Sequence, residues 1–148
     1  MTPEPKQEPP VRELPGAVEF TKTITEFDVY SFAGITGDFY PVHINAVYAA
    51  SHPVGERVAH GALTVGLMST VAGRWMLQNG VDGLSLGYNR MRFTKPVRFG
   101  DTISLAQAMT ARSEDGHRIT CRVEARNQHD EVVAVAEHLI WDAEPPGQ

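Results

Sequence analysis

The sequence predicts an α+β fold, in which a curved antiparallel sheet wraps around one central apolar helix. Residues 61–80 carry apolar side chains on all sides of the expected helix, which is typical of a helix buried inside a protein. Residues 84–141 alternate apolar and polar side chains with a period of two, which is typical of strands. At 148 residues the chain is long enough for one domain, so helix and sheet should bury their apolar faces together.

The two ends of the chain are expected to lie outside this domain. Residues 1–16 contain five prolines and several charges, which predicts a flexible, loosely attached arm. This segment lacks the apolar region of a secretory signal. Residues 143–148 are expected to form a flexible tail, which leaves residues 17–142 for the folded domain.

Residues 24–52 are expected to form two short helices with a break between them. Thr25 suits the N-cap of the first helix, with Asp28 as a carboxylate in its first turn. Gly37 suits the residue after its last turn, because glycine adopts the left-handed conformation without steric cost. Pro41 suits the start of the second helix, where its missing N–H is no loss.

The long apolar helix contains two glycines, Gly66 and Gly73, which weaken a helix by themselves. Close approach of a neighbouring backbone is the expected compensation. The apolar side chains that predict burial on every side are Leu63, Val65, Leu67, Met68, Val71, Ala72, Trp75 and Met76.

About five antiparallel strands are expected. The turns SEDG and NQHDE separate three alternating runs, and Gln107 is the one polar residue on the apolar face of the first. The expected strands are AVEFTKTI, LSLGYNRMRF, the runs around residues 103–109 and 119–125, and VVAVAEHLIW.

Composition argues against several classes of function. The formal charge of −5 argues against a nucleic-acid-binding surface, which usually has a basic balance. The longest weakly polar run is too short to span a membrane. Cys121 is the single cysteine and cannot form an internal disulfide, which predicts a reducing, cytoplasmic compartment.

The segment GITGDFYPVHIN places Asp38 and His43 five positions apart. Residues five apart do not share a face of an unbroken helix. Because Gly37 and Pro41 turn the chain between helices, the two side chains can converge on one water. Histidine and carboxylate are the side chains suited to proton transfer near neutral pH. From the residues alone, Asp38 as a turn residue and His43 as a solvated helix residue remain alternatives.

Three segments together carry a family resemblance: GDFYPVH, then AHGALTVGLMS, then PVRFGD. In this order they resemble the MaoC-like dehydratases, which include the R-specific enoyl-CoA hydratases. The resemblance extends over residues 20–141 and implies a single hot-dog domain that usually pairs as a dimer. The family pattern is commonly G-D-x-N-P-x-H. Tyr40 replaces its asparagine, and Asn45 stands where an aspartate is frequent.

The resemblance implies a hydro-lyase that interconverts a trans-2-enoyl thioester and an (R)-3-hydroxyacyl thioester. Asp38 and His43 would hold the water, one as base and the other as proton donor, in an order that the sequence leaves open. The Gly61 N–H, at the start of the buried helix, would bind the thioester oxygen. Ser69 would support Asp38. A plain helix-start glycine and a serine bonded to a backbone carbonyl are the alternatives.

Arg90 and Arg92 share a strand face by alternation. They are candidates to meet the phosphates of coenzyme A or the acidic surface of an acyl carrier protein, with a solvated strand face as the alternative. No metal is expected, because His43, His52 and His60 match no common ligand spacing. No cofactor is expected, because coenzyme A enters as part of the substrate.

Two other functions remain open. Hot-dog domains also serve as thioesterases, and some chains are non-catalytic subunits of heteromeric dehydratases. The presence of both Asp38 and His43 argues against the latter. A homodimer is expected, and neither a nucleic acid nor a membrane is expected as a partner. Acyl chain length and the choice between coenzyme A and a carrier protein are not determined by the sequence.

Overall fold

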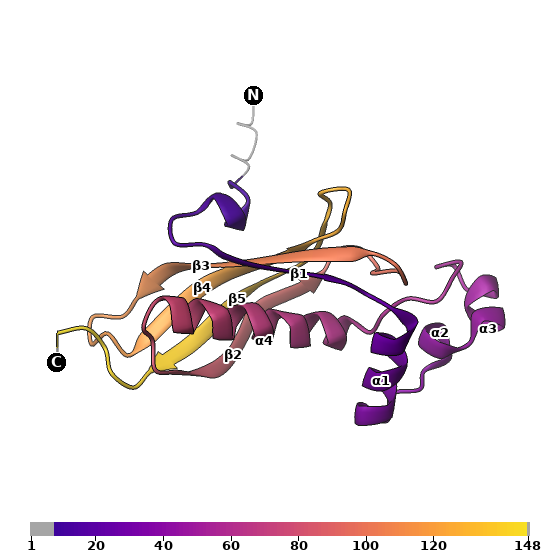
Figure 1. Ribbon diagram of the computed structural model, residues 1–148, viewed down its shortest axis with the longest axis horizontal. Helices are drawn as coiled ribbons and strands as arrows, with labels where there is room; N and C mark the ends of the chain where they lie inside the picture. Colours follow the sequence, from indigo (N-terminus) through magenta and orange to yellow (C-terminus); the bar gives the residue numbers. More distant parts are fainter. Residues whose placement is uncertain (1–7, 148) are drawn as a thin grey trace.

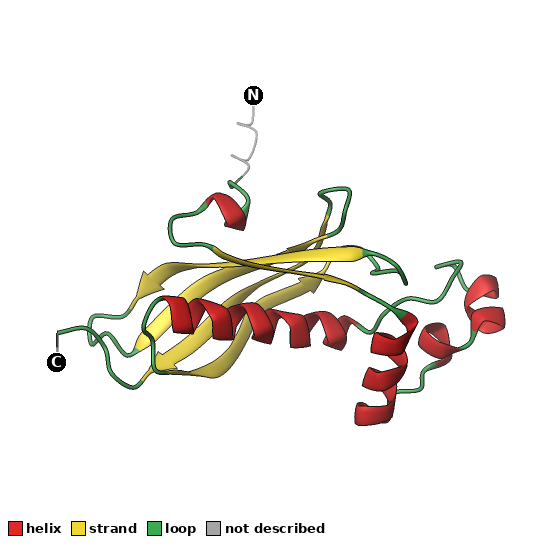
Figure 2. Ribbon diagram, viewed as in Figure 1, coloured by secondary structure: helices red, strands yellow, loops and turns green. Residues whose placement is uncertain are grey.

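The computed structural model describes residues 8–147 and shows one long helix packed along one face of a single sheet (Figures 1 and 2). The elements are, in chain order, η1 (Val11–Glu13), β1 (Val18–Thr23), α1 (Glu26–Thr36), α2 (Pro41–Ile44), α3 (Ala46–Ser51), α4 (Gly61–Gln78), β2 (Gly83–Phe93), β3 (Thr102–Arg112), β4 (Arg118–Arg126) and β5 (Val132–Asp142). In the described chain, no helix is both long and apolar enough to cross a membrane.

The five strands form one antiparallel sheet in the order β1-β3-β4-β5-β2. α4 lies along one face of this sheet, and α1, α2 and α3 lie beyond the N-terminal end of α4 (Figure 1). The expected architecture is therefore confirmed. The short helices are brought to the same end of the molecule as the start of α4.

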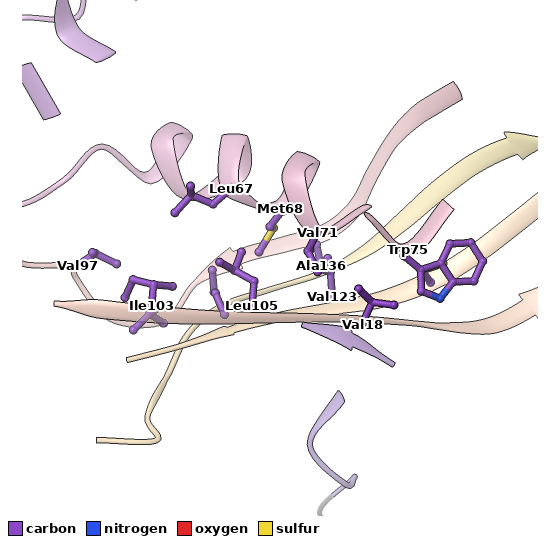
Figure 3. Close-up of a cluster of buried hydrophobic side chains, with 14 of the residues drawn as sticks. Val18, Leu67, Met68, Val71, Trp75, Val97, Ile103, Leu105, Val123 and Ala136 are labelled. Carbon is purple, nitrogen blue, oxygen red and sulfur yellow. The ribbon is translucent and has the colours of Figure 1, made fainter. Parts of the chain in front are cut away.

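The core lies between α4 and the inward side chains of the sheet (Figure 3). Met68 and Val71 of α4 are fully buried, as is Leu105 of β3. The expectation that α4 is buried on every side is wrong, because the sheet covers only one of its faces. Ser69 lies on the exposed face. At Gly66 and Gly73, an added Cβ would meet nothing within 4 Å, so the expected close backbone approach is not made within one chain.

Local sequence signals account for the short helices. The Thr25 hydroxyl accepts the backbone N–H of Asp28, and the Asp28 carboxylate accepts that of Thr25, which forms a capping box. Gly37 ends α1 with a φ of 80°. Pro41 begins α2 as expected. The second expected helix is divided at Asn45, whose side chain accepts the Tyr48 N–H and caps α3.

The core also holds a buried polar pair. His138 Nδ1 lies 3.2 Å from Gln107 Oε1, and its Nε2 lies 2.8 Å from Ser85 Oγ. Gln107 and His138 are 0% and 1% exposed. Burial lowers the pKa of His138 to about 4, because the charged imidazolium is poorly solvated there.

The arm expected over residues 1–16 differs from the structure where the chain is described. Val11 is 1% exposed, packs with Ala106 and Ala108, and donates its N–H to Glu124 Oε1. Arg12 makes two bonds to the Asp130 carboxylate, at 2.6 and 3.1 Å. η1 thus lies on the face of the sheet opposite α4 (Figure 1), while residues 1–7 lie outside the described part.

The tail expected over residues 143–148 also differs in part. Pro145 is buried and packs against Gly116. The Ala143 N–H donates to the Asp82 carbonyl oxygen. Composition alone predicted flexible chain ends, but a few of their apolar and charged side chains contact the sheet and its turns. Gln148 lies outside the described residues.

Candidate active site

Asp38 lies in the break between α1 and α2, and its side chain is half exposed. Its Oδ1 accepts the Tyr40 N–H at 3.2 Å, and its own N–H donates to Thr36 Oγ1 at 3.2 Å. This is the local turn that a short acidic side chain forms readily. It satisfies one carboxylate oxygen and leaves the other directed toward the neighbouring histidines, 4.0 Å from His60 Nε2.

His43 lies in α2, and the carbonyl oxygen of Val58 determines its tautomer. Nδ1 is 2.7 Å from that oxygen. A carbonyl only accepts, so the proton of the neutral ring is on Nδ1 and Nε2 keeps its lone pair. Val58 itself donates its N–H to the Val42 carbonyl oxygen, and Ala59 N–H donates to Val97, which anchors this segment.

The pKa of His43 lies below its ordinary value. Burial is the largest cause, because it disfavours the charged ring, and the neighbouring His60 lowers the pKa further. The bond to Val58 and the charge of Asp38 act in the opposite direction. His43 is therefore a neutral imidazole at pH 7, with a free Nε2 that is able to accept a proton.

His60 is the residue of this site that the sequence interpretation missed, since it was considered only as a metal ligand. It is 2% exposed and its ring stacks on that of His43, with 3.9 Å between centroids and 28° between planes. Its Nε2 lies 2.9 Å from the Asp38 carbonyl oxygen. Its place directly before Gly61, in the segment AHG, is the signal that was available in the sequence.

Gly61 is the first residue of α4, so its N–H has no partner within the helix. A Cβ at this position would lie 2.7 Å from the half-exposed Phe93 ring, which would have to move aside. The helix start borders a pocket of about 260 Å³, lined by Gly61, Thr64, Phe93, Val97 and Val133 among others. An unpaired N–H at the positive end of a helix suits a developing oxyanion.

Ser69 is not brought to Asp38 within one chain. It follows Gly61 by eight residues, or about 12 Å along the helix axis, while Asp38 lies beyond the N-terminus of α4. Its side chain is exposed, whereas a buried hydroxyl was expected. The supporting role of Ser69 therefore stays a prediction.

Arg90 and Arg92 lie on the face of the sheet opposite α4. Arg90 has a φ of 52°, within a bulge of β2 between Asn89 and Arg92, and its guanidinium is 3.5 Å from Glu137. Arg92 lies opposite Val135. Both partners alternate with the core residues of β5. The structure does not bring the two arginines to the Asp38–His43 pair of the same chain, and their phosphate contact stays a prediction.

Asp38, His43 and His60 offer ligand atoms within 4.8 Å of one another, a spacing that a metal ion requires. Two features make them poor ligands for a single ion. The His60 Nε2 donates to the Asp38 carbonyl oxygen and so has no lone pair to offer. The two imidazoles are also stacked, so their in-plane lone pairs lie in separate planes and do not converge on one point. The group suits a water between Asp38 and His43 better.

Tyr40 lies beside both Asp38 and His43. Its backbone carbonyl accepts the His43 N–H at 3.0 Å, and its backbone N–H donates to the Asp38 carboxylate. The ring lies edge-on to His43, at 6.2 Å between centroids, and to Tyr48, at 6.3 Å. The backbone of Tyr40 thus connects both members of the pair, and its ring is half-exposed.

Comparisons with known proteins agree with this geometry. A family model described as MaoC like domain matches residues 11–133. The chain is 37% identical to the 3-hydroxybutyryl-CoA dehydratase of Methylorubrum extorquens, over 80% of this chain and 73% of the relative. It is 33% identical to the (R)-specific enoyl-CoA hydratase of Rhodospirillum rubrum, over 72% of each.

Solved structures show the same fold. The unliganded R-hydratase from Pseudomonas aeruginosa matches with a TM-score of 0.74 and 31% identity, over 86% of this chain and 80% of that one. This agreement, with the curved five-stranded sheet packed against α4, confirms the expected hot-dog fold.

Proposed function

Because the chain belongs to the MaoC-like domain family, we propose that it is a hydro-lyase acting on acyl thioesters. It interconverts a trans-2-enoyl thioester and a 3-hydroxyacyl thioester, with R stereochemistry as in the relatives named for it. The single observation that carries this function is the bond from His43 Nδ1 to the Val58 carbonyl oxygen. It leaves a basic nitrogen free beside the Asp38 carboxylate.

The geometry favours His43 as the group that moves the proton. His43 Nε2 takes a proton from the bound water as its oxygen attacks C3 of the enoyl group, and returns that proton to C2. The hydroxyl is then on C3, the hydrogen is on C2, and His43 is neutral again. Asp38 accepts a hydrogen bond from the second O–H of the water and stabilises the transient imidazolium by its charge. Both groups work on one water.

Gly61 supplies the oxyanion donor of the proposed site. As water adds, negative charge develops on the thioester oxygen, and the unpaired N–H at the start of α4 is the donor placed to receive it. The contact between Phe93 and Gly61 holds one wall of the adjoining pocket. His60 joins the two positions, because it directly precedes Gly61 while its ring bonds the Asp38 carbonyl oxygen and stacks on His43.

Incubation with crotonyl-CoA tests the proposal. Loss of the conjugated enoyl absorbance without release of free thiol is expected. Release of free thiol would show a thioesterase instead. A protein that does neither, while a longer enoyl-CoA panel and an enoyl carrier protein are also unchanged, would fit a non-catalytic subunit and would overturn the proposed function.

The substrate carrier and the assembly belong to the same proposal. The substrate is an acyl-CoA or acyl carrier protein thioester, handled in the cytoplasm.

The functional unit is a homodimer, because many large apolar side chains of the single chain are exposed. They include Ile35 at 84%, Leu77 at 86% and Leu84 at 68%. β2 also leaves a free sheet edge. Sedimentation as a monomer of 16.3 kDa would contradict this assembly.

A further inference from the structure

We infer that His60 is a positioning residue of this site, whose side chain ties the loop that carries Asp38 to the first turn of α4. This role rests on the proposed function, because it concerns the distance between the bound water and the Gly61 N–H. His60 touches neither the water nor the thioester directly. It acts through Asp38, His43 and Gly61.

The first support is the bond between His60 Nε2 and the Asp38 carbonyl oxygen, at 2.9 Å across 22 residues of sequence. The other bonds of Asp38, to Thr36 and Tyr40, are local and move with the loop. The Asp38 side chain is half exposed, so packing does little to hold it. The bond from His60 is thus what connects this loop to the start of α4.

The second support is the packing of the ring. The His60 imidazole lies between Phe32, at 4.8 Å between centroids, and His43, at 3.9 Å. Phe32 belongs to α1 and His43 to α2, so one ring contacts both short helices. The next residue is Gly61, whose N–H is the oxyanion donor. The water-binding half and the oxyanion half of the site therefore meet at His60.

The third support is an unpaired atom. The His60 Nδ1 is buried and has no hydrogen-bond partner among the described residues. Buried polar atoms are nearly always paired, because leaving one unpaired costs free energy. A phenylalanine would fill the same space without that cost. The bond that Nε2 makes to Asp38 is what distinguishes histidine from an apolar ring here.

Two substitutions separate the hydrogen bond from the packing. His60→Phe keeps a flat ring between Phe32 and His43 but removes the donor. His60→Gln keeps a donor at the position of Nε2 and loses the ring. Ile119→Val, in the core of β4 and away from the site, serves as a control for a small loss of stability. All three are compared with the wild type for kcat, KM and melting temperature.

We expect His60→Phe to lower kcat about 10- to 100-fold with KM changed by less than about twofold, since small misplacements of reacting groups are costly. His60→Gln should recover most of kcat although it loses more packing. Ile119→Val should lower the melting temperature and leave kcat unchanged. A kcat that follows melting temperature across the three variants would show a structural role and overturn the inference, as would His60→Phe with wild-type kcat.

Nitrogen NMR of the wild-type imidazoles gives a readout that requires neither activity nor a folded variant. The expected signature of His60 is a proton on Nε2, bonded to the Asp38 carbonyl. A proton on Nδ1 alone would overturn the positioning role even if the enzyme hydrates crotonyl-CoA. A wild type with no activity on any enoyl thioester would overturn the proposed function, and the catalytic meaning of the bond with it, even if the NMR signature is found.

Discussion

The Nδ1 atom of His43 lies 2.7 Å from the carbonyl oxygen of Val58, a residue 15 positions later in the chain. This contact determines where the ring carries its proton and which nitrogen keeps its lone pair. It also explains why a histidine in a four-residue helix has a defined orientation. The N–H of Val58 in turn donates to the carbonyl oxygen of Val42, so two hydrogen bonds connect α2 to the segment around Val58.

His43→Gln should abolish most of the activity. The glutamine side chain has no basic nitrogen to accept the proton of water. We expect kcat to fall about 100- to 10,000-fold, the usual contribution of general acid–base catalysis. The measurement is crotonyl-CoA hydration, with the melting temperature as the control for folding. Near-wild-type turnover would show that His43 is not the base.

Asp38→Asn tests the carboxylate without disturbing its turn. The asparagine oxygen still accepts the Tyr40 N–H, so the loop geometry should be retained. The variant loses the charge that supports the imidazolium, and we expect kcat/KM to fall at least about 100-fold. Full activity in this variant, with an unchanged melting temperature, would remove Asp38 from the catalytic pair.

The activity should depend on pH through His43. Because burial lowers the pKa of His43, the ring is neutral and active above that pKa and protonated below it. We expect log kcat/KM to rise with pH, to level off, and to have its midpoint below 6.5. The charge of Asp38 raises this pKa, so Asp38→Asn should move the midpoint of its residual activity lower. A midpoint above 6.5 in the wild type would contradict the assignment.

The stability of the fold should also fall in acid, through His138. Its pKa is about 4 in the folded chain and about 6.5 when unfolded, so the unfolded state binds the proton more tightly. The stabilisation is present above pH 6.5 and is lost as the pH falls toward 4, by up to about 3 kcal/mol.

Denaturant unfolding between about pH 4 and 7 measures this effect. His138→Gln keeps partners for Gln107 and Ser85 and removes the titration, so its free energy of unfolding should depend less on pH. His129→Gln, at an exposed turn, is the matched control and should keep the wild-type dependence. Equal pH dependence in all three proteins would refute the assignment to His138.

Gly61→Ala should damage the site more than its small size suggests. The new Cβ would lie 2.7 Å from the Phe93 ring, so the ring or the start of α4 must shift. Because Phe93 is 54% exposed, its ring can move aside, so we expect a loss of at most about 1 kcal/mol of stability and a kcat at least about tenfold lower. Gly34→Ala is the control, since it adds a methyl group to an exposed turn of α1 with nothing within 4 Å. It should gain up to about 1 kcal/mol and keep full activity.

Local features could be predicted from the sequence because their causes lie within a few residues. The capping box of Thr25 and Asp28, the left-handed Gly37 and the helix start at Pro41 each depend only on adjacent backbone. Period-two alternation likewise predicted the strands, since side chains on a strand point to alternate faces. The family resemblance identified Asp38, His43 and Gly61, which the structure brings to one end of the molecule.

Only the tertiary structure decided which distant residues meet. His60 joins Asp38 across 22 residues, Val58 orients His43, and Val11 packs on the outer face of the sheet. None of these contacts leaves a periodic or local signature, because each depends on how the short helices dock at the end of α4. The burial of α4 on one face rather than all round has the same origin. A single sheet covers one side of a helix, and the apolar pattern of the sequence does not reveal what covers the other.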